Sequence, residues 1–238
     1  ELASKKIISQ YIENYGIAIL SEDIYANLRF TEAYATLINK SASDLIQKGY
    51  KKLLAPHVES RMQETLQLLE SLGFQRQMEM YLFEASLEGM DVQLPLEMPV
   101  GIEVFSFHHI CIESLHNALN KAFSENPIGF LDVDELNKYI SDEDFLKSCS
   151  FYASVGEEIV SFLMVKKQKP KIAYLAYLGT VPQWQRKGLG LLLIKNSLYN
   201  AVKRGLNKAV GDQIYPGNIA IIRLLEKVGF YLACSQLN

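Results

Sequence analysis

The amino-acid sequence predicts an α/β protein with a central mixed β-sheet flanked by helices, preceded by a shorter copy of the same pattern. Two observations support this prediction. Residues 101–235 show strand-like and helix-like segments in the order β-α-α-β-β-β-α-β-α-β, which is typical of a mixed sheet with helices packed on its faces. Residues 37–74 and 193–230 align without a gap, which indicates an internal repeat.

Composition excludes several classes of protein. With 238 residues, 49% of them hydrophobic and 21% charged, the chain has the make-up of a globular rather than a disordered protein. A net charge of −3 provides no general cationic surface for nucleic acid. No apolar run approaches the roughly 20 residues of a membrane-spanning helix. We therefore expect a soluble protein with neither nucleic-acid nor membrane partners.

The cysteines and the first residues indicate the cytoplasm. Three widely spaced cysteines without a CxxC pair suit neither a disulfide framework nor a zinc site. The apolar pair at residues 7–8 is followed at once by Ser9 and Gln10, so no signal-peptide core is present. His108-His109 lacks a carboxylate at helical spacing. We expect a cytoplasmic protein without a metal.

The complete pattern begins with one strand and two helices. Residues 101–107 alternate and are rich in β-branched and aromatic residues, as a half-buried strand is. Residues 114–123 carry apolar residues at helical spacing and stop at Asn126-Pro127. Residues 132–139 repeat that spacing after an acidic start, which suits the positive end of a helix dipole.

A hairpin and a third strand follow. Residues 150–155 and 159–166 flank the turn Gly156-Glu157-Glu158, whose two carboxylates we expect to be solvated rather than catalytic. Residues 171–179 form the next strand of this sheet and are closed by Val181-Pro182.

The last four elements alternate between helix and strand. Residues 189–204 carry a single apolar stripe and end at a glycine, as an amphipathic helix does. We expect a strand at residues 208–215, a second helix at residues 219–227 and a final strand at residues 230–235.

The repeat has a constant offset of 156 residues, and 10 of its 38 aligned positions are identical. Gly49 falls on Gly205 and Gly73 on Gly229, each where a helix is expected to end and a left-handed residue without Cβ is favoured. In the first copy we expect a helix ending near residue 48, a helix at 58–72 and strands at 16–20, 51–55 and 76–84.

The first copy is incomplete. It has too few residues before position 16 for the earlier strands and helices, and Glu32 and Tyr34 stand where the second copy has glycines. We predict a degenerate partial domain at residues 1–95, with a linker over 85–100, and a complete domain at residues 96–238.

The junction between the strand at 171–179 and the next helix is the most informative motif. Gly188 and Gly190 let the backbone approach a ligand closely, and a new helix directs free N–H groups at that point, which suits a pyrophosphate. Arg186 and Lys187 add positive charge. The alternative is a tight strand-to-helix turn without a ligand. The absence of a P-loop and of a GxGxxG motif argues against ATP and NAD.

Two motifs carry a resemblance to a known family. The segment Gln185–Gly190 matches a Q/R-x-x-G-x-G/A motif, and Asn218–Phe230 matches an ending that runs from an asparagine to Gly-Phe. From about residue 100 to 238 the sequence thereby resembles the GNAT superfamily of N-acetyltransferases. The resemblance implies the acyl-CoA N-acyltransferase fold, with acetyl-CoA as the acetyl donor.

The resemblance also implies which residues hold acetyl-CoA. The backbone amides of six consecutive residues would hold the pyrophosphate, namely Arg186, Lys187, Gly188, Leu189, Gly190 and Leu191. Asn218 would hydrogen-bond the cofactor, and the pantetheine arm would pair with the main chain of Leu178, Gly179 and Thr180. A splay between the strands that end near Gly179 and Tyr215 would leave a slot for the thioester, where a backbone N–H would polarise the carbonyl.

The acid and base of the reaction are not found at the family's usual positions. Where many members have a tyrosine acid this chain has Leu225, and where some have a glutamate base it has Gln213. The neighbouring strand offers Tyr174 and Tyr177 but no carboxylate. Tyr215 shares a strand face with Gln213 by the period of two, so we predict it as the catalytic acid, with a packing role as the alternative.

Two functions follow. The first is an acetyl-CoA-dependent N-acetyltransferase that transfers the acetyl group directly to a primary amine of a small molecule or a peptide. The second is an acyl-CoA-binding module without turnover, which the replacements at Gln213 and Leu225 favour. We prefer the first, and the sequence leaves open whether the chain forms a homodimer.

Overall fold

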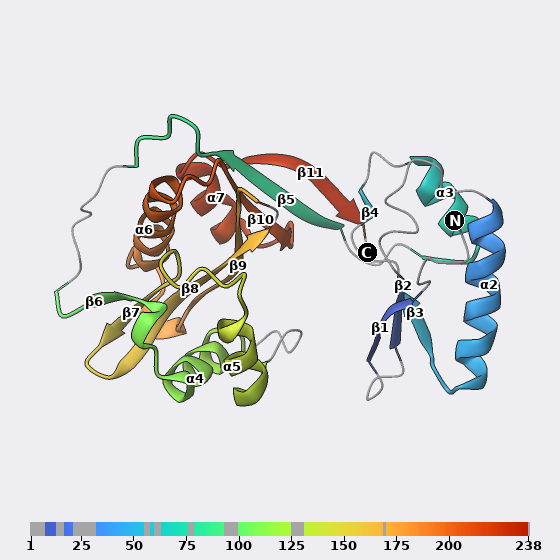
Figure 1. Ribbon diagram of the computed structural model, residues 1–238, viewed down its shortest axis with the longest axis horizontal. Helices are drawn as coiled ribbons and strands as arrows, with labels where there is room; N and C mark the ends of the chain where they lie inside the picture. Colours follow the sequence, from blue (N-terminus) through green and yellow to red (C-terminus); the bar gives the residue numbers. More distant parts are fainter. Residues whose placement is uncertain are drawn as a thin grey trace. The chain divides into compact units, whose positions relative to one another are not determined.

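The strands that the structure describes form two sheets, one of three strands and one of eight, and Figure 1 shows their arrangement. The computed structural model describes residues 8–12, 17–20, 32–54, 58–59, 63–75, 79–92, 100–124, 131–168 and 170–237. The larger sheet contains both parallel and antiparallel neighbours and is covered by helices. This arrangement confirms the predicted fold class.

The eight-stranded sheet combines strands from both halves of the chain. Its members are β4 (Val58–Glu59), β5 (Glu79–Ser86), β6 (Glu103–Ser106), β7 (Phe151–Val155), β8 (Glu158–Gln168), β9 (Ile172–Thr180), β10 (Lys208–Ile214) and β11 (Tyr231–Leu237). Their order across the sheet is β4-β11-β5-β10-β9-β8-β7-β6. The strands from β6 to β9 are antiparallel neighbours, whereas β9 and β10 are parallel.

Helices cover the central strands of this sheet on both sides. They are α4 (Ile112–Ala122), α5 (Val133–Ser141), α6 (Leu189–Lys203) and α7 (Ile219–Lys227), with short 3-10 turns at η3 (Phe107–His109) and η4 (Pro182–Trp184). In Figure 1, α4 and α5 lie below the sheet and α6 and α7 above it. The core under α4 and α5 includes the fully buried side chains of Leu115, Leu136, Phe162 and Met164.

The acidic start of α5 acts as a helix cap. The Asp132 carboxylate accepts a hydrogen bond from the Glu135 backbone N–H at 2.8 Å, and the Glu135 carboxylate accepts one from the Asp132 N–H at 3.0 Å. This reciprocal pair satisfies two backbone donors that the first turn would otherwise leave unpaired. The helix predicted from the acidic residues at 132–139 is thereby confirmed, with observed bounds of Val133–Ser141.

The described residues of the first half include a three-stranded sheet and the helices α2 and α3. Its elements are β1 (Ile8–Ile12), β2 (Ile17–Leu20), α2 (Glu32–Gln47), β3 (Lys52–Leu54) and α3 (Gln63–Ser71). The strand β2 pairs antiparallel with β1 and parallel with β3. The strand β1 was not predicted from the sequence.

Two boundaries in the first half were predicted wrongly. The helix expected over residues 58–72 begins only at Gln63, because Val58–Glu59 is strand β4 and pairs with residues 236–237. A two-residue strand leaves no period in the sequence, and its partner lies far along the chain. The linker expected over residues 85–100 cannot include Ala85 and Ser86, which belong to β5, and its residues 93–99 lie outside the described residues.

The internal repeat is visible in the backbone hydrogen bonds at the ends of four helices. Gly49, Gly73, Gly205 and Gly229 all have φ between 72° and 91°. In each case the glycine N–H donates to the carbonyl three residues back, and the following N–H donates to the carbonyl five residues back. This is the helix-ending motif that a left-handed glycine permits, so the predicted role of the repeated glycines is confirmed.

The repeat extends to the pairing of strands. In the first copy Ile17, Ala18 and Ile19 of β2 pair in parallel with residues 52–54 of β3. In the second copy Ile172, Ala173 and Tyr174 of β9 pair in the same way with residues 208–210 of β10. Both ladders are three residues long. The paired residues of β3 and β10 lie 156 residues apart in the sequence, and those of β2 and β9 lie 155 apart.

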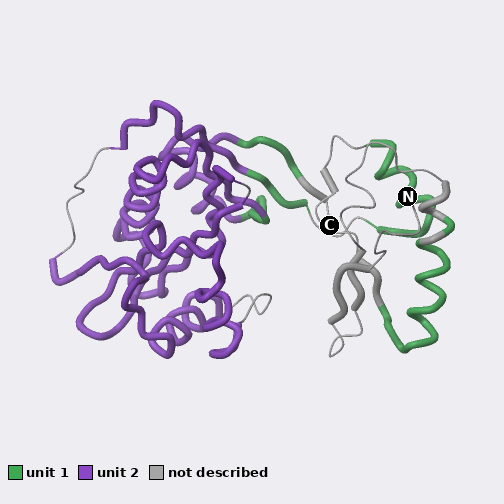
Figure 2. Tube along the Cα trace, in the orientation of Figure 1, with its two compact units in different colours: residues 1–82, 213–217, 232–238 green, residues 83–212, 218–231 purple. Residues whose placement is uncertain are grey.

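The chain folds as two compact units, which Figure 2 distinguishes by colour. One contains residues 1–82, 213–217 and 232–238, and the other contains residues 83–212 and 218–231. The predicted domain boundary between residues 95 and 96 stays a prediction. Among the described residues, no helix has the length and apolar character to cross a membrane.

Candidate functional site

The start of α6 presents backbone donors without a side-chain cap. Gly188, the N-cap, has φ 81°, and its carbonyl accepts the first helical hydrogen bond from the Leu192 N–H at 3.0 Å. The N–H groups of Leu189, Gly190 and Leu191 precede that bond and therefore have no partner within the helix. Together with the helix dipole they form an arrangement that favours an anion.

The loop before α6 is tied back to the end of β9. The Gln185 side chain donates from Nε2 to the Thr180 carbonyl at 3.2 Å. Arg186 follows with φ 62°, a left-handed conformation that few non-glycine residues adopt. The Lys187 ammonium lies 4.2 Å from the centroid of the Trp184 ring, an attraction that holds this exposed cation beside the loop.

Strand β9 has one paired and one largely open edge where the cofactor residues were predicted. Toward β8, residues Leu178, Gly179 and Thr180 stand opposite Leu163, Phe162 and Ser161. Toward β10, pairing covers only the first three of its nine residues, Ile172–Tyr174. The two parallel strands therefore run on past the end of their ladder, in agreement with the predicted splay.

A bulge interrupts β9 inside this open stretch. Met164 stands opposite Tyr177 and the next residue, Val165, stands opposite Leu175, so Ala176 is the extra residue. A bulged residue leaves the ladder and bends its strand. The sequence carried no sign of it, because a single extra residue only shifts the alternation.

The structure gives packing reasons for two of the predicted glycines. A Cβ on Gly179 would lie 2.4 Å from the buried ring of Phe162, so no larger residue fits without moving that ring. A Cβ on Gly190 would lie 3.0 Å from Leu224 of α7, so this glycine lets the two helices approach each other. Packing within the protein is therefore a reason for a glycine at both positions, whether or not a ligand binds there.

Asn218 begins α7. Its Oδ1 accepts a hydrogen bond from the Ile221 N–H at 3.4 Å and so caps the helix. Within the described part of the chain no acceptor meets its Nδ2 atom. The side chain can therefore cap α7 and still donate a hydrogen bond to a ligand.

The residues that were considered for acid and base roles lie in different surroundings. Leu225 is 2% exposed and belongs to the core. Gln213 has φ 54°, which breaks the strand alternation that was used to place Tyr215 on its face. Tyr215 lies beyond β10, is 56% exposed and packs its ring against Gly217. Its catalytic role stays a prediction.

A tyrosine–aspartate pair that the sequence analysis missed lies where the β9–β10 ladder ends. The Tyr174 hydroxyl donates to Asp212 Oδ1 at 2.5 Å. Tyr174 is paired with Val210, the last ladder residue of β10, and Asp212 lies two residues further on. An acidic residue within the strand expected at residues 208–215 is a signal that the sequence analysis did not use.

Two further half-buried tyrosines, Tyr139 and Tyr177, lie near Tyr174. The rings of Tyr139 and Tyr177 lie 5.6 Å apart and edge to face. Burial raises the pKa of all three phenols, and the Asp212 carboxylate raises that of Tyr174 further. These phenols therefore remain protonated and act as hydrogen-bond donors at neutral pH.

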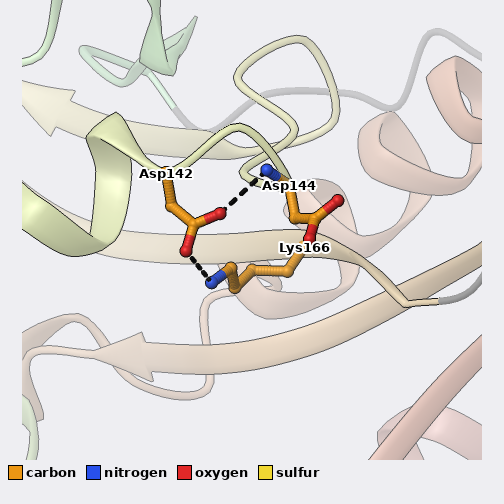
Figure 3. A network of polar contacts seen from close by, with 3 residues as sticks. All are labelled: Asp142, Asp144 and Lys166. Carbon is orange, nitrogen blue, oxygen red and sulfur yellow. Dashed lines mark hydrogen bonds and ion pairs between the residues drawn. The ribbon is translucent and has the colours of Figure 1, made fainter.

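The end of α5 is fastened to β8 by Asp142 (Figure 3). Its Oδ2 accepts a hydrogen bond from Lys166 Nζ at 2.8 Å, and its Oδ1 accepts one from the Asp144 backbone N–H at 2.9 Å. These bonds, that of Lys166 first, lower the pKa of the Asp142 carboxyl. Lys166 Nζ also lies 4.7 Å from the Tyr139 ring centroid, which helps to hold that ring over the sheet.

Other polar residues have ordinary partners. His108 Nδ1 lies 2.9 Å from Ser106 Oγ, and Glu158 forms an exposed ion pair with Lys121 at 2.7 Å. Among the described residues no group of three or more histidine, cysteine or acidic side chains could hold a metal ion.

Comparison with known proteins gives one family match. The profile of the acetyltransferase (GNAT) family matches residues 112–230, half of the chain. The mycothiol acetyltransferase of Corynebacterium glutamicum is 25% identical to the chain over 177 residues. The match covers 71% of this chain and 60% of that relative's length.

Two solved structures are similar over most of the chain. The GCN5-related N-acetyltransferase from Sphaerobacter thermophilus has a TM-score of 0.72 at 16% identity and covers 95% of this chain and 73% of that one. A tandem GNAT protein from the clavulanic acid biosynthesis pathway has a TM-score of 0.73 at 13% identity and covers 93% of this chain and 74% of that one. At these identities the likeness shows a shared fold.

Proposed function

The chain belongs to the acetyltransferase (GNAT) family, and on that premise we propose that it transfers an acetyl group from acetyl-CoA to a primary amine. One observation carries the proposal. The uncapped start of α6 is the next α-helix end after β9, with its N-cap Gly188 eight residues beyond Thr180, and the ladder of β9 with β10 ends after Tyr174. An anion site and a strand edge free for pairing thus lie next to each other in the chain.

The described residues fit acetyl-CoA. The N–H groups of residues 189–191 suit its pyrophosphate, with Arg186 and Lys187 adding charge. The open edge of β9 over Leu178–Thr180 suits the amides of the pantetheine arm, and Asn218 Nδ2 is available as a donor. When bound, acetyl-CoA supplies an acetyl group activated as a thioester.

The chain's own residues would hold the two reactants and polarise the carbonyl group of the thioester. Ala176 has no partner in the register of β8 with β9, and we propose that its backbone N–H stabilises negative charge on the carbonyl oxygen. Holding the amine and the acetyl group side by side removes much of the entropic barrier without a covalent enzyme intermediate. The acceptor would be a small molecule or a peptide.

A non-catalytic acyl-CoA-binding module is the second candidate. It is favoured by Leu225, which is buried, and by Gln213, since neither can exchange a proton at the positions where family members carry an acid or a base. This candidate requires acetyl-CoA binding without release of the thiol.

Two measurements separate the candidates. Calorimetry should show binding of acetyl-CoA by the full chain, and a Gly188→Val variant should bind more weakly because a β-branched residue cannot adopt φ 81° without strain. Thiol release from acetyl-CoA should then depend on an added amine drawn from a panel of polyamines, amino sugars, amino acids and peptides. Binding without any amine-dependent release would favour the second candidate, and absence of binding would contradict both.

A further inference from the structure

We infer that Asp212 takes the proton from the attacking amine and that Tyr174 is the positioning residue that aims its carboxylate. This inference rests on the proposed acetyl transfer and identifies a proton acceptor in this chain. It stands on the hydrogen bond between the two side chains and on their place at the end of the β9–β10 ladder.

The pair lies where the two parallel strands stop pairing. Tyr174 is in the last ladder position of β9, and its side chain reaches forward to Asp212, two residues beyond the last ladder position of β10. The Ala176 bulge follows Tyr174 after one intervening residue. A carboxylate is therefore held beside the stretch of β9 that is proposed to receive the thioester.

The direction of the hydrogen bond leaves Asp212 as the acceptor. Burial and the adjacent carboxylate both raise the pKa of the Tyr174 phenol, so it keeps its proton and donates. Asp212 is half-buried, and in the described part of the chain no donor meets its second oxygen, Oδ2. That oxygen is free to accept a proton from a ligand.

Within the part of the chain that the structure describes, Asp212 forms no ion pair with a lysine or an arginine. Lys166 stands opposite Tyr174 on β8, but its ammonium is bound to Asp142. The other nearby groups are Tyr177 on β9 and Tyr139 and Glu135 on α5, which are phenols and a carboxylate. An ammonium group that approached this face would meet acceptors and aromatic rings.

The attacking ammonium loses two protons in the proposed step. The bound ammonium gives one proton to Asp212, which frees the nitrogen lone pair. The nitrogen forms a bond to the acetyl carbon while the carbon–sulfur bond breaks, and the sulfur keeps the electron pair of that bond. The second proton lost by nitrogen neutralises the thiolate, and Asp212 later releases its proton to solvent. The sum is an amide, a thiol and one proton.

Activity of substituted full-length chains tests the inference. Asp212→Asn keeps the size and the hydrogen bond but cannot take a proton, so we expect kcat to fall roughly 10²- to 10⁴-fold, the range of general-base catalysis, with acetyl-CoA affinity unchanged. Asp212→Glu should retain part of the rate. The matched control is Glu84→Gln, which removes a carboxylate on β5 that is paired with Lys208 of β10 at 2.7 Å and should leave kcat unchanged.

The split between kcat and KM separates proton transfer from a structural role. Asp212→Asn should lower kcat and leave the KM for acetyl-CoA unchanged, because the carboxylate acts on the amine and not on the cofactor. Tyr174→Phe removes the hydrogen bond that holds Asp212 Oδ1, so kcat should fall less than in Asp212→Asn, again with an unchanged KM for acetyl-CoA. A wild-type kcat in both variants would overturn the inference.

One readout needs no acetyl-CoA. Urea unfolding of Tyr174→Phe, Asp212→Ala and the double variant should show non-additive losses of stability, because each single substitution breaks the same hydrogen bond. Full additivity would contradict the pairing of the two residues. A wild type that acetylates amines while Asp212→Asn keeps its full rate would overturn this inference alone. A wild type that binds acetyl-CoA and acetylates none would overturn the proposed function as well.

Discussion

Asn218 carries two separable roles on one side chain. Its Oδ1 caps α7, and its Nδ2 is left to donate to a ligand. The cap contributes to the free energy of unfolding, whereas the proposed ligand bond contributes only to acetyl-CoA affinity. Substitutions that keep one atom and remove the other can therefore distinguish the roles.

We predict that Asn218→Asp leaves stability nearly unchanged and weakens acetyl-CoA binding, because aspartate caps a helix as well as asparagine but brings a charge and no donor. Asn218→Ala should lose about 0.5–2 kcal/mol of unfolding free energy. Urea unfolding and calorimetry measure the two effects. Equal acetyl-CoA affinity in wild type and Asn218→Asp would show that Nδ2 does not bind the ligand.

Gly179 is fixed by packing against Phe162. We predict that Gly179→Ala destabilises the protein by about 1–3 kcal/mol, the usual range for overpacking, because the added Cβ must displace a fully buried ring. Urea unfolding gives the free energy of unfolding of Gly179→Ala, of Phe162→Leu and of the double variant, which serves as the control. In a Phe162→Leu background the cost of Gly179→Ala should shrink, and full additivity would contradict the contact.

At the scale of elements, the fastening of α5 to β8 should depend on pH. The lowered pKa of Asp142 stabilises the fold while the carboxyl is ionised, above its unfolded-state pKa, and the contribution disappears as pH falls through the folded-state value. We predict that Asp142→Asn is less stable than the wild type at neutral pH and that the two converge on acidification. Denaturant unfolding in steps down to about pH 2 checks this, and a gap that persists in acid would contradict it.

Most elements could be predicted because their signals are local. The helices of the second half and the strands β7 to β10 have a clear period and end at glycine or proline, and all were found close to their expected bounds. The strand β4 and the Ala176 bulge could not be predicted. Each depends on which residue lies across the sheet, and no local pattern records that.

The candidate site likewise has one part with a local sequence signal and one part without. The loop at residues 185–190 has a sequence motif, and its left-handed Gly188 and uncapped helix start follow from that motif. The pairing of Tyr174 with Asp212 joins two strands through a three-residue ladder. The two side chains meet because of the register of that ladder. Register depends on how two strands pair, so neither strand's sequence alone predicts it.

At the scale of the whole molecule, the two copies of the repeat share backbone features, but the first copy lacks the glycines of the candidate site. The two copies share helix-ending hydrogen bonds and the three-residue parallel ladder. At the positions of Gly188 and Gly190, however, the first copy has Glu32 and Tyr34. Only the second copy therefore retains the glycine loop that the proposed function uses.

The place of β5 between β10 and β11 predicts how truncated chains behave. A chain of residues 96–238 lacks β5 and leaves two strands with unpaired backbone groups inside the sheet, so we expect aggregation and no cooperative unfolding. A chain of residues 76–238 keeps the strand and should unfold cooperatively in urea. If both chains unfold cooperatively, β5 is not needed and the domain boundary lies at residue 96.

The same strand also constrains the order of events on the ribosome. Residues 79–86 leave the exit tunnel early, but the neighbour β10 is synthesised about 120 residues later and β11 at the end of the sequence given. During that interval the apolar side chains of β5, including Phe83, have no sheet to enter. The apolar residues of Glu79–Ser86 therefore lack their sheet neighbours until Lys208–Ile214 has been synthesised, and non-native association is favoured during that interval.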